Sequence, residues 1–212
     1  MQKIDTSTSS TDIPWNASIT HGSLTDARDG QVYRTVKIGT QTWMAQNLNY
    51  VVDSSWCYAN SADSCVKYGR LYQWASAMDT STTYDTSLLN AARPHQGICP
   101  TGWHVPSDAE WTKLTDTILS SSTAVTVLRS TEGWLGNPTD TGTDVYGFHV
   151  LPSGSGHYNG AFSDYPSIAY FWSSSEFSAS IAWNRDITIG DASVDRYYGI
   201  KSDGFSTRCL EN

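Results

Sequence analysis

The run from Cys99 to Trp111 constrains the fold of this chain more than any other segment, because it joins a cysteine, turn residues and a complete helix start. Ser107 is a natural N-cap, and Glu110 stands three residues later, where its side chain closes a capping box. The pattern predicts that a helix begins at Asp108.

The predicted helix has one apolar face. Trp111, Leu114 and Ile118 recur at intervals of three and four residues, which is the spacing of an amphipathic helix packed on a core. The cysteine that precedes this helix has a distant counterpart in Cys209, close to the C-terminus. A bridge between Cys99 and Cys209 would tie the start of the helix to the last strand.

The four cysteines allow three pairings. Cys57 and Cys65 lie close together in a polar loop, which favours a short local bridge in an oxidising compartment. A structural zinc site needs closely spaced ligand pairs such as C-x2-C, and the sequence has none. We therefore predict the disulfides Cys57–Cys65 and Cys99–Cys209.

Charge and hydropathy exclude several kinds of partner. The chain has a net charge of -8 and no block of basic residues, so we expect it to bind neither nucleic acid nor an anionic membrane. No stretch is long and apolar enough for a transmembrane segment. The residues after Met1 lack the apolar core of a signal peptide. Because disulfides require an oxidising compartment, we expect a secreted or cell-surface protein whose export signal is absent from this chain.

The chain divides into a tail and one domain. Residues 1–25 are rich in Ser and Thr and have no periodic apolar pattern, so we interpret them as a flexible tail or linker. Residues 26–212 are long enough to form one domain with a substantial core.

The order of patterns along this domain predicts an α+β fold, because helices and strands are segregated. A strand pair is expected over residues 32–44 and a first helix over residues 71–78, before the capped helix at Asp108. A weaker helical pattern covers residues 124–129, and Gly-rich irregular chain follows. Late strands rich in aromatic and β-branched residues are expected at 168–172, 181–189, 194–200 and 205–210.

A set of ordered Gly, Trp and Cys motifs resembles a known family. The motifs are Asp29–Tyr33, Val36–Leu48, Tyr68–Trp74, Cys99–Pro106, Asp144–Phe148, Leu151–Gly154, Phe171–Glu176 and Ser206–Cys209. From about Asp26 to its end, the chain resembles the Fibrobacter succinogenes major paralogous domain (FISUMP) family of bacterial surface and secreted proteins.

The resemblance implies a C-type-lectin-like fold, similar to that of formylglycine-generating enzymes, with two helices, a twisted antiparallel sheet and long irregular loops. Those enzymes use a closely spaced pair of late cysteines that binds copper. The last third of this chain has a single cysteine, Cys209, so the resemblance implies the fold without that chemistry.

The sequence indicates no catalytic or metal-binding constellation. The five histidines show no ligand spacing such as H-E-x-x-H, and His104 stands just before a helix cap, where a packing role is expected. The loop Asn137–Asp144 offers oxygen-bearing side chains of the kind that Ca²⁺ prefers, but the same residues are ordinary turn formers. We therefore expect no resident metal, with calcium at this loop as the alternative.

The late strands carry the candidate ligand site, because they combine flat aromatic faces with planar hydrogen-bonding groups. Sugars stack on aromatic rings and bond to carboxylates, amides and guanidinium groups, and protein epitopes also favour Tyr, Trp and Arg. The candidate residues are Glu176, Trp183, Asn184, Arg185, Asp191, Tyr197 and Tyr198. Because alternate aromatics in strands are often core residues, about half of these are expected to be buried.

These observations predict a non-catalytic extracellular module that binds a glycan or a protein through its C-terminal loops. One alternative is an enzyme acting on polysaccharide, which would need two carboxylates across a cleft. The clustered candidates for that role are Glu176, Asp186, Asp191 and Asp195. A second alternative is a structural subunit that assembles into fibres.

Overall fold

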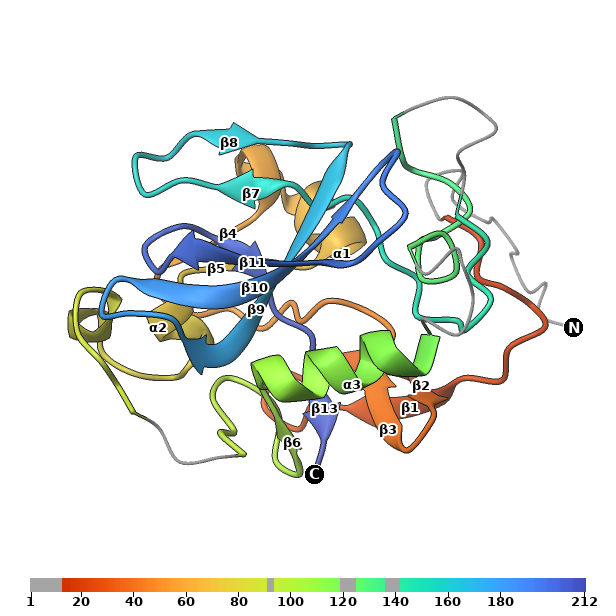
Figure 1. The fold of residues 1–212 in the computed structure, drawn as a ribbon, viewed down its shortest axis with the longest axis horizontal. Helices are drawn as coiled ribbons and strands as arrows, with labels where there is room; N and C mark the ends of the chain where they lie inside the picture. Colours follow the sequence, from red (N-terminus) through yellow and green to blue (C-terminus); the bar gives the residue numbers. More distant parts are fainter. Residues whose placement is uncertain (1–12, 91–93, 119–124, 136–141) are drawn as a thin grey trace, which may run out of the picture.

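The computed structural model describes residues 13–90, 94–118, 125–135 and 142–212, which form two main sheets with helices packed on them (Figure 1). The five-stranded sheet has the spatial order β1 (Gly22–Thr25), β2 (Val32–Ile38), β3 (Gln41–Met44), β13 (Leu210–Glu211) and β6 (Trp103–His104). The six-stranded sheet has the order β11 (Asp195–Ile200), β10 (Ile181–Thr188), β9 (Ile168–Glu176), β12 (Phe205–Ser206), β5 (Leu71–Tyr72) and β4 (Ser55–Trp56).

The remaining elements are short. β7 (Ser155–Gly156) and β8 (Phe162–Ser163) form a separate hairpin, and the α-helices are α1 (Ala62–Tyr68), α2 (Trp74–Ala77) and α3 (Asp108–Ile118). All strand pairs are antiparallel except β12 with β9, which is parallel. The protein is therefore a mixed α and β fold built mostly of curled antiparallel sheet, as the segregated pattern predicts.

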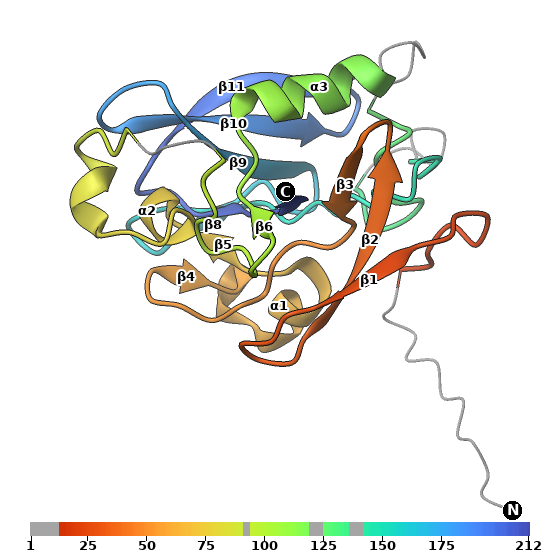
Figure 2. The same cartoon turned by 90° about the horizontal axis from the view of Figure 1, so that it is seen from below.

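The capped helix is confirmed as α3, which begins at Asp108 and lies across β9 and β10 (Figures 1 and 2). The backbone N–H of Glu110 donates to Ser107 Oγ at 3.3 Å, and the backbone N–H of Ser107 donates to Glu110 Oε2 at 2.8 Å. This reciprocal pair satisfies two donors that a helix start leaves without partners. The predicted apolar face of Trp111, Leu114 and Ile118 is buried in the core.

The predicted strand pair and late strands are also confirmed, with one difference at the C-terminus. Residues 32–44 form β2 and β3, and the strands β9, β10 and β11 follow the expected ranges. The expected strand at residues 205–210 is instead two strands, β12 and β13, which belong to different sheets. A single buried segment therefore contributes to both sheets, because the chain passes from one to the other between Ser206 and Leu210.

The helix prediction for residues 71–78 is wrong in its extent. Leu71 and Tyr72 form strand β5, and only Trp74–Ala77 is helical. The sequence pattern missed α1 because this helix buries only Cys65 and Tyr68, which leaves no apolar stripe. The described residues thus contain three α-helices where two were expected.

The weak helical pattern at residues 124–129 does not form a helix in the described residues. Residue 124 lies outside them, and residues 125–128 form turns. Arg129 instead bridges to Val150 in parallel, and the backbone N–H of Val150 donates to Leu128 O at 2.9 Å. Tertiary pairing with the later loop therefore overrides the local propensity.

Part of the predicted tail packs on the domain. Ile13 is buried, Trp15 stacks on His149 with ring centroids 3.9 Å apart, and β1 pairs with β2. The predicted tail boundary at residue 25 thus falls after a strand of the domain. Residues 1–12 lie outside the described residues.

Both predicted disulfides, Cys57–Cys65 and Cys99–Cys209, are present. The first joins the middle of α1 to the residue that follows β4. The second links the segment before β6 to the segment before β13, across a sequence separation of 110 residues. Within the ranges described, no helix has the length and apolar character that crossing a membrane requires.

We expect Ser107→Ala to lower the free energy of unfolding by about 1 kcal/mol, because the substitution removes the N-cap acceptor of α3. Thr117→Ala, on the exposed side of the same helix, is the matched control and should change stability by less than about 0.5 kcal/mol. Chemical denaturation measures both. An unchanged midpoint for Ser107→Ala would show that the capping box contributes nothing to stability.

Candidate functional site

A cavity of about 260 Å³ opens beside β11, the strand at the edge of the six-stranded sheet. Its wall comes from the β7–β8 hairpin, from β9, β10 and β11, and from the chain leading into β12 (Figure 1). The lining residues are Ser155, His157, Asp164, Tyr170, Asn184, Asp186, Tyr197, Tyr198, Gly199, Ile200, Asp203 and Phe205. We call this the β11 cavity.

Exposed aromatic rings continue the wall of the β11 cavity outward. Tyr197 and Tyr198 are 55% and 42% exposed, and their rings stack with centroids 4.7 Å apart. Tyr198 also stacks on Phe177, at 5.0 Å. These three residues form what we call the aromatic row. Because Tyr198 is stacked between the other two rings, the row offers to solvent the outer parts of Tyr197 and Phe177 and the edge of Tyr198, beside a polar cavity.

Three carboxyl groups lie in the wall of the same cavity. Burial, with a contribution from the neighbouring Asp195, raises the pKa of Asp186 from 3.8 to about 7. Asp164 accepts hydrogen bonds from Tyr170 Oη at 3.1 Å and from the hydroxyl groups of the β7–β8 hairpin. Asp203 lies 3.6 Å from the imidazole of His157, and burial raises its pKa. The cavity is therefore rich in hydrogen-bond acceptors.

Asn184 holds an unsatisfied polar atom in this wall. The side chain is buried, and its Nδ2 donates to Asp186 Oδ1 at 2.5 Å. Its Oδ1 has no hydrogen-bond partner among the described residues. Because a buried acceptor without a partner is costly, a ligand hydroxyl or N–H group that reached this atom would be stabilised.

The structure brings three of the seven predicted site residues into the β11 cavity, namely Asn184, Tyr197 and Tyr198. Glu176 lies elsewhere, in a buried ion pair with Lys201 Nζ at 2.7 Å. It also accepts backbone N–H groups from the segment at residues 89 and 90. These bonds, with the Lys201 ion pair, hold the pKa of Glu176 below its usual value, although burial acts in the opposite direction.

Trp183 and Arg185 are occupied by contacts within the domain. Arg185 is buried and donates to Asp108 Oδ1 at 2.7 Å. Arg196 pairs with the same carboxylate at 2.9 Å and lies 3.4 Å over the centroid of the Trp183 ring. One face of Trp183 is thus covered. The remaining predicted residue, Asp191, is exposed at the turn between β10 and β11.

Sequence reasoning missed five polar residues of the cavity, which are Ser155, His157, Asp164, Tyr170 and Asp203. Three of them belong to the β7–β8 hairpin and the chain beside it, Tyr170 lies in β9, and Asp203 lies in the loop before β12. No local signal identifies them, because only the packing of the β7–β8 hairpin over the sheet brings them together.

The predicted calcium loop lies mostly outside the described residues, which exclude 136–141. Asp144 is described and buried, and it accepts the backbone N–H of His149 at 2.8 Å. In the described ranges, no group of three or more His, Cys, Asp or Glu side chains is arranged to hold a metal ion.

Comparison with known proteins gives one match. The model of a family described as the Fibrobacter succinogenes major domain matches residues 36–211, which include the six-stranded sheet, the five-stranded sheet except for β1 and the start of β2, and the whole wall of the β11 cavity. No curated protein and no solved structure matches the chain.

The raised pKa of Asp186 predicts a pH-dependent stability. Between the ordinary pKa of about 4 and the folded value of about 7, the folded protein binds more protons than the unfolded chain. The free energy of unfolding contributed by this group therefore falls as pH rises through that window, and it is constant above it. Asp186→Asn, which mimics the neutral acid, should become more stable relative to wild type from pH 4 to pH 7. Denaturation at a series of pH values measures this difference, and parallel profiles would contradict it.

Proposed function

Because this chain belongs to the Fibrobacter succinogenes major domain family, we propose that it is a non-catalytic ligand-binding module of a bacterial secreted or cell-surface protein. We further propose that its sheets and loops correspond to a C-type-lectin-like fold and that it binds a glycan at the β11 cavity. Two disulfides support an extracellular setting, since such bonds persist in oxidising compartments.

The observation that carries this proposal is the joining of the aromatic row to a polar cavity at one sheet edge. Aromatic rings provide flat apolar surface at low cost in side-chain entropy, and they act as anchors in binding sites. Next to them, the carboxyl groups of Asp186 and Asp203 can accept hydrogen bonds from sugar hydroxyl groups. A site that binds a sugar needs aromatic rings to stack on the C–H faces of the sugar, and it needs acceptors for the sugar hydroxyl groups.

The charge of the β11 cavity limits the chemical class of ligand that it can bind. Its wall contains the carboxyl groups of Asp164, Asp186 and Asp203, against one imidazole, that of His157. An anionic sugar would be repelled by these carboxyl groups, so the proposed ligand is a neutral glycan. The cavity volume of about 260 Å³ is just below the range of about 300–1,000 Å³ typical of small-molecule sites, so the cavity would hold the end of a glycan and further units would lie along the aromatic row.

One observation favours a second candidate, a polysaccharide-acting enzyme. Asp186 has a pKa near 7 and shares the cavity with two other carboxyl groups. A carboxyl group that stays protonated near neutral pH, beside an ionised one, is the pairing that a glycosidase requires. An enzyme would release new reducing ends from a polysaccharide, whereas a binding module would not.

We expect Tyr197→Ala to weaken binding of a neutral oligosaccharide by about 1 to 3 kcal/mol without changing the fold, because the row loses an exposed anchor. The ligand is first selected from a panel of neutral glycans, and isothermal titration calorimetry gives the affinities. Tyr197→Phe keeps the ring and should retain most of the binding. Val51→Ala, which truncates a side chain 68% exposed before β4 at the opposite edge of the sheet, should have no effect.

Two further variants separate the site from the core and binding from turnover. Trp172→Ala should destabilise the domain by about 3 to 5 kcal/mol, because this side chain is fully buried. Equal destabilisation by Tyr197→Ala would contradict the assignment of Tyr197 to the site. Release of reducing ends by wild type, and its loss in Asp186→Asn, would establish the enzyme in place of the binding module.

A further inference from the structure

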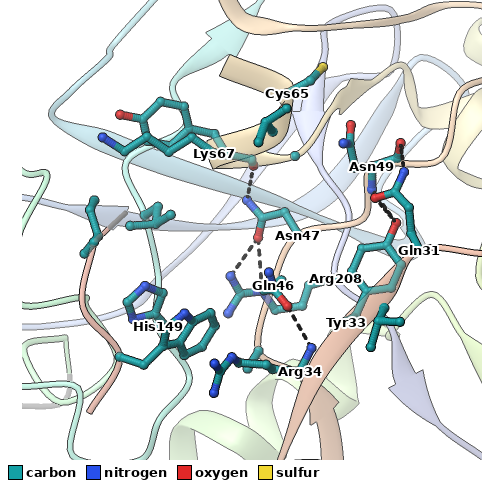
Figure 3. Close-up of a pocket in the computed structure, with 18 residues that line it drawn as sticks. Gln31, Tyr33, Arg34, Gln46, Asn47, Asn49, Cys65, Lys67, His149 and Arg208 are labelled. Atoms are coloured by element: carbon teal, nitrogen blue, oxygen red, sulfur yellow. Dashed lines mark hydrogen bonds between the residues drawn. The ribbon is translucent and has the colours of Figure 1, made fainter. Parts of the chain in front are cut away.

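A second cavity, of about 280 Å³, lies between the N-terminal segment, β2, α1 and the chain before β13 (Figure 3). Its lining residues are Ile13, Trp15, Gln31, Val32, Tyr33, Arg34, Ala45, Gln46, Asn47, Asn49, Cys65, Val66, Lys67, Tyr68, Gly69, His149, Leu151 and Arg208. We call this the Arg208 cavity. It shares no residue with the β11 cavity.

The charge of the Arg208 cavity is opposite to that of the whole chain. The protein carries 21 acidic and 13 basic residues, yet the described residues of the wall include Arg34, Lys67 and Arg208 and no Asp or Glu. Side-chain amides supply the other polar groups. A wall of this composition favours an anionic ligand. It is less suited to a neutral sugar, because it has no carboxylate that could accept hydrogen bonds from the sugar hydroxyl groups.

Arg208 is a buried guanidinium that bonds only to neutral acceptors. Its Nε and Nη2 donate to Asn47 Oδ1 at 3.1 and 2.7 Å, and its Nη1 donates to the backbone carbonyl of Phe148. No carboxylate of a described residue lies within ion-pair distance of it. Burial lowers the pKa of Arg208 to about 9, so the group remains charged at neutral pH. The nearby carboxylate of Asp144 partly opposes this effect of burial, but it is too far away for an ion pair. Burying a charge that has no directly paired counterion is costly, and an anion in the cavity would offset part of that cost.

Arg34 and Lys67 add two cations at separate positions around the cavity. Figure 3 shows Lys67 above Asn47 and Arg34 below it, with Arg208 next to Asn47. The Arg34 guanidinium lies 4.7 Å from the centroid of the Trp15 ring, and Lys67 Nζ lies 5.2 Å from that of Tyr68. Neither forms an ion pair with a residue that the structure describes, so the charged ends of both are free to bind a ligand.

We infer that the Arg208 cavity binds a small organic carboxylate about the size of one sugar acid. The planar fork of Arg34 matches a carboxylate in a bidentate arrangement, and Lys67 adds a point charge. The volume lies at the lower end of the range for small-molecule sites, which excludes a long polymer from the interior. The sugar acid can be free or the terminal residue of an acidic polysaccharide, because both present the same carboxylate.

The test titrates the full chain with galacturonate, with galactose and with inorganic phosphate, by calorimetry and by NMR of the backbone amides. Galacturonate should bind and shift amides around Lys67 and Arg34, whereas galactose and phosphate at equal concentration should not. Arg34→Gln combined with Lys67→Gln should weaken galacturonate binding at least tenfold. Lys37→Gln combined with Lys113→Gln removes the same charge from surfaces outside the cavity wall and should leave the affinity within twofold.

Several results would overturn the inference: no binding of galacturonate at millimolar concentration, equal binding of galactose, tighter binding of phosphate, or equal losses in the two double variants. A galacturonate trimer that binds as well as the monomer would support it and identify a chain end as the source. Binding of the neutral glycan is tested separately, with the Tyr197 variants at the β11 cavity. A negative result with galacturonate would therefore leave the proposed function intact.

Discussion

The structure depends on one short segment, residues 205–210, which is built into both main sheets. Its first two residues form β12, between β9 and β5, and its last residue starts β13, between β3 and β6. All six residues of the segment are buried. Cys209 fixes this crossing to the chain before β6 through the bridge to Cys99, across 110 residues. A closed loop of this length restricts the unfolded chain by roughly 4 to 5 kcal/mol in the chain-entropy account.

The same crossing segment contributes to both cavities. Phe205 lines the β11 cavity, and Arg208 lines the cavity on the other side of the segment. The two cavities differ in charge, since carboxyl groups dominate the first and cations the second. Because the buried segment is held by two sheets and a disulfide, both walls rest on rigid backbone, which favours binding by a preformed site.

The first residue of α3 links the helix start to β11, the edge strand that contains Tyr197 and Tyr198. Asp108, the first helical residue, pairs with Arg185 of β10 and with Arg196 of β11. An acidic residue at a helix N-terminus is also favoured by the helix dipole. Those two ion pairs hold the pKa of Asp108 below its usual value against the effect of burial. Arg196 in turn covers one face of the Trp183 ring, so the contact that fixes β11 makes that face unavailable to a ligand.

The sequence by itself determined the features that depend on residues close to one another along the chain. The Ser107 capping box placed α3, alternating apolar residues placed β2 and the late strands, and close spacing indicated the Cys57–Cys65 bridge. Only the tertiary structure decided that α1 is a helix, that residues 205–210 divide between two sheets, and which polar residues meet. Asp164, Asp186 and Asp203 share a cavity because a hairpin packs over a sheet. Local propensity and periodicity reflect contacts within a few residues, whereas a binding site is made by contacts between distant segments, and these have no signature in the order of the residues.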